Sequence, residues 1–346
     1  MNTRVNRRAF LTNSAAQLTA GSFILPLMTE QAAADAPPSK LGIATTSYLT
    51  VWRPQDTLEF LEHCHALGAA GIQSAIHGDP AKLRARAEQL GMYVEAMVPL
   101  PHGDDTSAFE ESMKTAQAAG AIAVRSACLG TRRYETFKSL DQWHDFVTSS
   151  NRSVAAALPV LDRYKIPLGL ENHKDWTADE MHAFLEKHSS EYLGVCLDFG
   201  NNISLLDDPM YVIEKLAPYA VSTHLKNMAA DSYDNGFLLS EVLLGDGFLD
   251  LPRIISIVKQ ARPKTRFSLE MITRDPLRVP CLTDNYWVSF PDRNGIYLAR
   301  TLKLVQRQRS PKPLPQISQH THDEQLKVEN ENVIACMRYA HEHLEL

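Results

Sequence analysis

The chain has 346 residues, of which 44% are hydrophobic and 22% are charged. This is the composition of an ordinary globular protein, so disorder is excluded as its main state. There are 35 lysines and arginines against 41 aspartates and glutamates, and the net charge of −6 leaves no basic excess for a nucleic-acid partner. The five cysteines contain no Cys-x-x-Cys pair, which excludes a disulfide framework and a cysteine-type zinc site.

The first segment predicts an export signal. Residues 1–36 contain the pair Arg7–Arg8, then a moderately apolar stretch over 15–28, then small residues up to Ala36. This layout is typical of a signal peptide, and the twin arginine indicates the route that carries folded proteins. The apolar stretch is too short for a permanent membrane span. We therefore expect a periplasmic or otherwise exported protein with no stable membrane insertion after cleavage; a basic amphipathic helix is the alternative.

The rest of the chain alternates short apolar runs with helical patterns. The runs show little inward–outward alternation, as expected for strands that are covered on both faces. Eight such strand–helix units predict an α/β fold, the (β/α)8 or TIM barrel. The eight runs are Leu41–Tyr48, Ala70–Ile76, Met92–Val98, Ile122–Cys128, Ile166–Leu170, Leu193–Leu197, Ala220–Leu225 and Arg266–Ile272.

Two long loops and a tail complete the predicted organisation. The loops run over 228–248, after the seventh strand, and over 273–292, after the eighth. Both leave the carboxyl ends of strands, where barrel active sites are built. The tail has a proline-containing linker and then one amphipathic helix over 323–346. This helix could pack on the barrel or on a second subunit, so a homo-oligomer is one of the possible assemblies. The predicted parts are a signal peptide (1–36), a barrel (37–310) and a linker with a C-terminal helix (311–346).

Each of the last four strands ends in a side chain that can bind a metal ion. Glu171 ends the fifth strand, Asp198 the sixth and His224 the seventh, and Glu270 lies near the end of the eighth. Alone, each would more often be a loop cap, half of a salt bridge or a core histidine. Four adjacent strands, however, bring the side chains to one rim of the barrel mouth. This mostly oxygen set suits one divalent cation, Mn²⁺ first, with Mg²⁺, Co²⁺ or Zn²⁺ as alternatives.

Five short segments carry a family resemblance: LGLENH, LDFGNN, STHLKN, SLEM and GDGFLDLPRI. In their order and their places on the strands they resemble the xylose-isomerase-like TIM barrels, the sugar phosphate isomerase/epimerase group, over roughly residues 41–310. In ketose epimerases of this group, a Glu, an Asp, a His and a Glu bind one divalent metal. The resemblance therefore implies Glu171, Asp198, His224 and Glu270 as ligands. It also implies Glu171 and Glu270 as the catalytic proton-transfer pair, one on each face of the substrate.

Four further residues are candidates for substrate binding. His173 and Lys226 follow Glu171 and His224 by two places, and Lys226 therefore has the strand parity of a pocket residue. The alternatives are a surface role for His173 and a rim salt bridge for Lys226. Arg274 lies beyond the eighth strand and could hold an anion. Relatives often read Asp-x-Gly-His, where the His contacts substrate, and Asn201 stands at that position here.

The predicted chemistry is proton transfer next to a carbonyl group. A divalent cation would stabilise the resulting enediolate, and carboxylates with suitable pKa values would move the proton. We expect a metal-dependent sugar isomerase or epimerase that acts on a small carbohydrate through a metal-stabilised enediolate. The first alternative is a metal-dependent lyase or hydratase of 3-keto-sugars or keto-glycosides. The second is a non-catalytic carbohydrate-binding barrel.

Overall fold

The computed structural model of the protein describes residues 39–48 and 50–346. The predicted export signal, residues 1–36, lies outside the described residues and stays a prediction. Within the described ranges, we find no helix with both the length and the apolar character that a membrane span requires.

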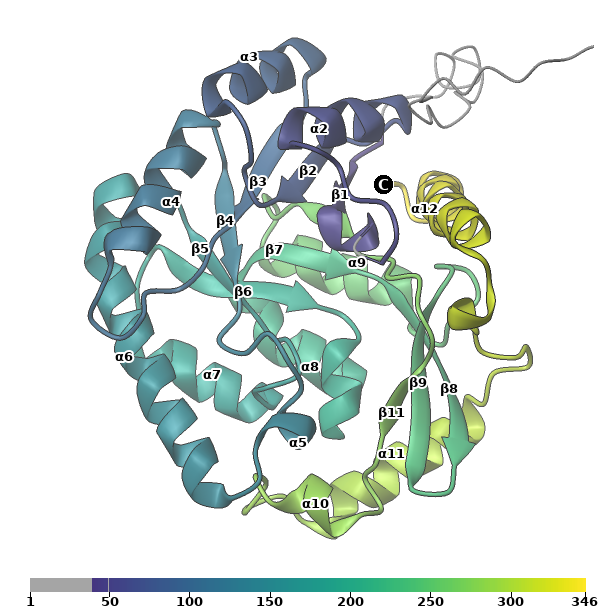
Figure 1. The fold of residues 1–346 in the computed structure, drawn as a ribbon. Coiled ribbons are helices and arrows are strands. Elements are labelled where there is room, and N and C mark those ends of the chain that lie inside the picture. The colour runs from purple at the N-terminus through teal and green to yellow at the C-terminus, as the bar shows by residue number, and fades with distance from the viewer. Residues whose placement is uncertain (1–38, 49) are drawn as a thin grey trace, which may run out of the picture. The chain divides into compact units, whose positions relative to one another are not determined.

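Eight parallel strands close into a barrel, in the order β1-β10-β7-β6-β5-β4-β3-β2 (Figure 1). Each strand lies within a predicted apolar run or ends one residue beyond it, which confirms the (β/α)8 barrel. The first run is wrong in its second half, because Thr45–Tyr48 forms a short 3-10 helix. The barrel strands are β1 (Leu41–Ala44), β2 (Gly71–Ser74), β3 (Tyr93–Met97), β4 (Ala123–Ser126), β5 (Leu168–Glu171), β6 (Leu193–Asp198), β7 (Ala220–Leu225) and β10 (Phe267–Leu269).

Helices surround the barrel on its outer side (Figure 1). Several begin at signals that the sequence carries: Asp79 and Asp208 each accept an amide of the first helical turn, and a proline follows at the first position. The helices are α2 (Thr57–Ala66), α3 (Pro80–Leu90), α4 (Ser107–Ala118), α5 (Arg133–Thr136), α6 (Leu140–Tyr164), α7 (Ala178–Lys187), α8 (Pro209–Leu216), α9 (Leu251–Ala261), α10 (Asp284–Trp287), α11 (Gly295–Arg307) and α12 (His322–His343). Further 3-10 turns lie at Asn201–Leu205, Ala217–Tyr219 and Ile317–Gln319.

The long connections after the seventh and eighth barrel strands lie where predicted, but part of each is β-structure. β8 (Asn227–Tyr233) and β9 (Gly236–Val242) form an antiparallel hairpin, and β11 (Leu277–Val279) pairs with β9. Gly236 has a φ of 152°, and a Cβ there would meet the carbonyl oxygen of Val279 at 2.2 Å. Only glycine therefore allows β11 to approach the start of β9 so closely.

The predicted C-terminal helix is confirmed as α12, which packs beside the start of the barrel (Figure 1). Its buried face includes Val333 and Ala340. The buried carboxylate of Glu329 accepts three backbone amides, from Thr50 (3.1 Å), Val51 (3.0 Å) and Trp52 (2.8 Å). The last helix therefore holds the segment that follows the first strand at the barrel mouth.

Candidate metal centre

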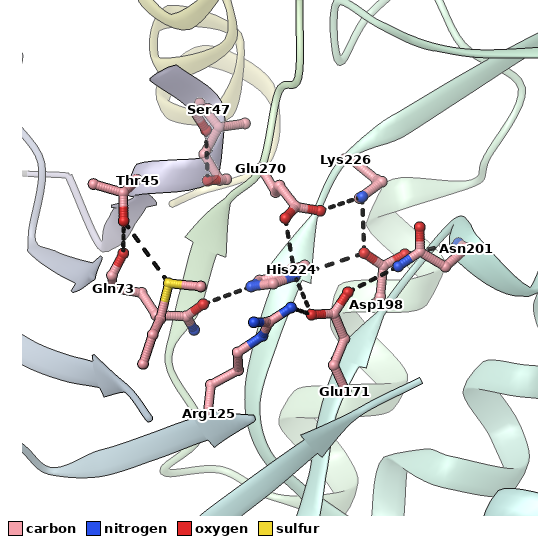
Figure 2. A network of polar contacts seen from close by, with 12 residues as sticks. Thr45, Ser47, Gln73, Arg125, Glu171, Asp198, Asn201, His224, Lys226 and Glu270 are labelled. Carbon is pink, nitrogen blue, oxygen red and sulfur yellow. Dashed lines mark hydrogen bonds and ion pairs between the residues drawn. The ribbon is translucent and has the colours of Figure 1, made fainter. Parts of the chain in front are cut away.

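Four side chains of the metal-binding type meet at the carboxyl ends of neighbouring strands (Figure 2). Glu171 ends β5, Asp198 ends β6, His224 lies in β7 and Glu270 directly follows β10. All four are buried, and one ligand atom from each lies within 4.8 Å of the others. The four residues predicted as metal ligands are therefore brought together in one group, which we call the ligand group.

His224 is oriented by two residues from the opposite side of the barrel. Its Nε2 lies 2.5 Å from Oε1 of Gln73, whose Nε2 donates to Oε2 of Glu95 at 2.9 Å. An amide oxygen can only accept a hydrogen bond, so this chain places a proton on Nε2 of His224. Metal-binding histidines are commonly oriented in this way through their second ring nitrogen.

The other ring nitrogen of His224 fits a metal ligand. Nδ1 lies 3.4 Å from Glu270 Oε1, 3.6 Å from Glu171 Oε2 and 3.7 Å from Asp198 Oδ2. It is buried and has no hydrogen-bond partner among the described residues. Buried polar atoms are normally paired, and a nitrogen that faces three carboxylates is a suitable donor for a divalent cation.

Two carboxylates of the ligand group, Asp198 and Glu270, have lowered pKa values and are kept ionised, as metal ligands must be. Burial raises the pKa of Glu270, but the charges of His224 and Lys226 lower it by more and hold it well below its usual value. Lys226 Nζ lies 2.8 Å from Asp198 Oδ2 and also pairs with Glu270 Oε2. Burial lowers the pKa of His224, but Cys196, Glu270 and Asp198 raise it by more, to about 10, so without a cation the ring carries a second proton, which a bound cation would displace from Nδ1.

Asp198 and Glu171 are also held in place by residues outside the ligand group. Asp198 Oδ1 accepts the backbone amides of Gly200 (2.9 Å) and Asn201 (2.7 Å). The side-chain amide of Asn201 donates to Glu171 Oε1 at 2.9 Å, and Arg125 of β4 pairs with Glu171 Oε2. The positions of both carboxylates are therefore fixed by these neighbours (Figure 2).

A cavity of about 350 Å³ opens onto the ligand group. Glu171 and Glu270 contribute to its lining, so a bound molecule would reach both carboxylates. The other lining residues that carry charge or can titrate are Arg125, Arg132, Glu135, His173, Lys174 and Arg274. A larger cavity, of about 610 Å³, is lined by residues 262–266 before β10, at the opposite end of the barrel.

Two of the four predicted substrate-binding residues, His173 and Arg274, line the cavity beside the ligand group. Arg274 also pairs with the buried Glu241 of β9, at 2.7 Å. Asn201 and Lys226 are instead buried against the carboxylates of the ligand group. Lys226 therefore forms a salt bridge, which is the alternative stated above. The salt bridge lies in the interior, however, and not at the rim. Contact of these four residues with a substrate stays a prediction.

Several residues around the ligand group were not predicted from the sequence. Gln73 and Arg125 carried a usable signal, because each is a polar residue inside an apolar run. Lys174 gave a weaker one, three places after Glu171. Glu241 gave no signal in the sequence, because it reaches Arg274 only through the hairpin of β8 and β9.

The hydrogen bond between Gln73 and His224 yields a first prediction. Gln73→Met keeps the approximate size of the side chain but removes the acceptor that orients the ring. We expect the dissociation constant for Mn²⁺ to rise about 10- to 100-fold, the range for loss of such a partner. Electron paramagnetic resonance of free Mn²⁺ measures this constant. Gln117→Met, at an exposed position of α4, is the control, and equal affinities in the two variants would contradict the assigned role.

A closed (β/α)8 barrel with a buried carboxylate–histidine group at its strand ends defines a TIM barrel with a candidate metal centre. The sequence profile of one family, the xylose isomerase-like TIM barrels, matches residues 61–287. The chain therefore belongs to this family.

Individual relatives differ in the reaction named for them. A curated relative is the 3-oxo-isoapionate decarboxylase of Pectobacterium atrosepticum, 28% identical over 227 residues, which are 61% of this chain and 78% of the relative. A D-psicose 3-epimerase structure, determined in the presence of D-fructose, has a TM-score of 0.52 and 15% identity over 77% of this chain and 96% of that one. The IolI protein with a bound zinc atom has a TM-score of 0.52 and 14% identity over 78% and 98%. At these identities the two structures show the fold alone.

Proposed function

We propose that this chain is a metal-dependent enzyme that acts on a small keto sugar through an enediolate. In this proposal Glu171, Asp198, His224 and Glu270 hold one divalent cation, with Mn²⁺ as the first choice. The observation that carries the proposal is the buried Nδ1 of His224, which faces three carboxylates without a hydrogen-bond partner among the described residues. Two of those carboxylates also line a cavity large enough for a sugar.

The residues of the chain supply the remaining parts of the reaction. A divalent cation, when bound, would polarise the substrate carbonyl and stabilise negative charge on its oxygens. Glu171 and Glu270 come from β5 and β10, which are separated in the barrel by β6 and β7. They therefore approach the cavity from two sides, so one can remove a proton from a carbon and the other can return a proton to the opposite face. This sequence of steps describes an epimerase, and transfer between adjacent carbons by one carboxylate describes an isomerase.

A lyase is a second candidate, favoured by the way Glu171 is held. Glu171 is tied to Arg125 and Asn201, which suits a fixed ligand better than a base that gains and loses a proton. A lyase that releases carbon dioxide needs only one proton-transfer group: the bond between the carboxylate carbon and the carbon next to the ketone breaks, its electron pair passes into the enolate, carbon dioxide leaves, and a proton is added to the enolate carbon. Glu270, which lines the cavity, would then be the group that relays a proton to the enolate carbon. The relative named as a decarboxylase of an oxo-sugar acid supports this candidate.

One experiment distinguishes these outcomes. The Mn²⁺-loaded protein is incubated in D₂O with a panel of keto sugars and keto-sugar acids, and the products are analysed by NMR and mass spectrometry. An epimerase or isomerase incorporates deuterium next to the carbonyl and keeps the carbon skeleton. A lyase releases carbon dioxide or water and leaves a smaller product. His224→Ala is the control for metal dependence. If the loaded protein causes neither exchange nor cleavage across the panel, the proposal is wrong.

A further inference from the structure

We infer that the cavity beside the ligand group binds a carboxylate of the substrate, through Lys174 with Arg125 and Arg274 beside it. The inference rests on the proposed function for the rest of the substrate, a keto sugar, and adds its class: a sugar acid. It concerns the wall of the cavity and not the ligand group itself.

The cavity has more positively than negatively charged side chains in its lining. Its lining includes four cationic side chains, Arg125, Arg132, Lys174 and Arg274, and Lys226 lies beneath it against the ligand group. Outside the ligand group, Glu135 pairs with Arg132 and Glu241 pairs with Arg274. A divalent cation would cancel most of the negative charge of the three ligand carboxylates. The positive side chains then outnumber the remaining negative ones, which favours an anionic substrate.

Lys174 is a buried lysine without an ion-pair partner among the described residues. Its side chain is buried, at 4% exposure, and lines the cavity. Among the described residues its ammonium group donates to the neutral side chain of Asn201, at 2.5 Å, and forms no ion pair. Burial first, and then the charges of Arg274 and Lys226, lower the pKa of Lys174 to about 7. A buried ammonium group is normally paired, and a substrate carboxylate would supply the missing negative charge.

The kind of donor in the cavity favours a carboxylate over a phosphate. Phosphate sites commonly use several backbone amides at the start of a helix. The helix that follows the lining residue Arg132 is α5, which has four residues, and the amide of Arg133 donates to the backbone oxygen of Lys174. The charged donors of the lining, Lys174 and the arginines, are side chains from separate elements, an arrangement that suits a single carboxylate.

Calorimetric titration of the Mn²⁺-loaded protein tests the inference with a matched pair of probes. D-Gluconate and D-glucitol share one carbon chain and differ in a terminal carboxylate. We expect D-gluconate to bind at least about tenfold more tightly than D-glucitol, since a charge-assisted hydrogen bond contributes about 1.5–3 kcal/mol. Lys174→Met should remove most of this preference, and Lys174→Arg should keep it. Lys264→Met, which removes an exposed lysine at the opposite end of the barrel, should leave it unchanged.

Three results of the titration would overturn the inference. The first is equal affinity for the two probes. The second is an unchanged preference for D-gluconate in Lys174→Met with Mn²⁺ still bound, which would place the carboxylate on the metal. The third is tighter binding of D-glucitol 6-phosphate than of D-gluconate. Failure of the proposed function gives a different pattern: D-gluconate is still preferred, but no substrate exchanges deuterium or is cleaved. Turnover of neutral keto sugars alone would remove the inference and leave the proposed function standing.

Discussion

Glu270→Gln is expected to lower kcat by about 10³-fold at saturating Mn²⁺. Glutamine keeps the length of the side chain and an oxygen that can bind the cation, but it cannot take up or release a proton. General acid–base groups contribute between about 10² and 10⁴ in rate, so the loss should fall within that range. Glu270 also lines the cavity, which places its carboxylate within reach of a bound substrate. Turnover of whichever substrate the D₂O panel identifies provides the measurement.

Glu171→Gln beside this variant separates the two candidate reactions. An epimerase uses both carboxylates, so the two substitutions should be similarly damaging. In a lyase Glu171 serves as a ligand only, and Glu171→Gln should cost less kcat than Glu270→Gln once Mn²⁺ saturates both. Glu214→Gln, at an exposed position of α8, should keep the wild-type rate. A wild-type rate in metal-saturated Glu270→Gln would contradict the role of Glu270 in proton transfer.

The second large effect is expected for His224→Ala, which should lose stoichiometric Mn²⁺. The substitution removes the Nδ1 atom that faces the three carboxylates and leaves a buried group with only oxygen donors. An ion at a hundred times its dissociation constant stabilises a folded protein by about 2.7 kcal/mol. Added Mn²⁺ should therefore raise the thermal midpoint of the wild type and leave that of the variant unchanged.

Metal content by mass spectrometry and thermal unfolding with and without Mn²⁺ together check this second prediction. His144→Ala, at an exposed position of α6, is the matched control and should behave as the wild type. Equal metal content in His224→Ala and the wild type, or an equal rise in midpoint, would show that the ion binds elsewhere.

The barrel and the ligand group could be predicted from the sequence for a shared physical reason. Strands that are covered on both faces read as continuous apolar runs, as in Leu193–Leu197, and parallel strands place their carboxyl ends at one rim. A chemically active side chain at the end of each of four successive runs therefore had to converge. The convergence follows from the order of the strands alone and does not depend on how the barrel closes.

The residues around the ligand group are brought there by the closing of the barrel, so they could not be predicted in the same way. Gln73 reaches His224 across 151 positions of sequence, because β2 lies on the other side of the barrel. Lys226 has the parity of a pocket residue, but it lies between β7 and β8, and its side chain ends against Asp198. The hairpin of β8 and β9 then brings Glu241 to Arg274.

The position of Glu329 has a consequence for how the protein is made. The ribosome delivers the amides of residues 50–52 long before the carboxylate that accepts them, which lies 277 to 279 residues further along the chain. While synthesis proceeds, all eight barrel strands can emerge before the segment after β1 has its partner. This side of the mouth is therefore completed only after α12 has been made. A premature stop in the linker before α12 would spare every strand and every metal ligand, yet it would leave the entrance to the barrel unfinished.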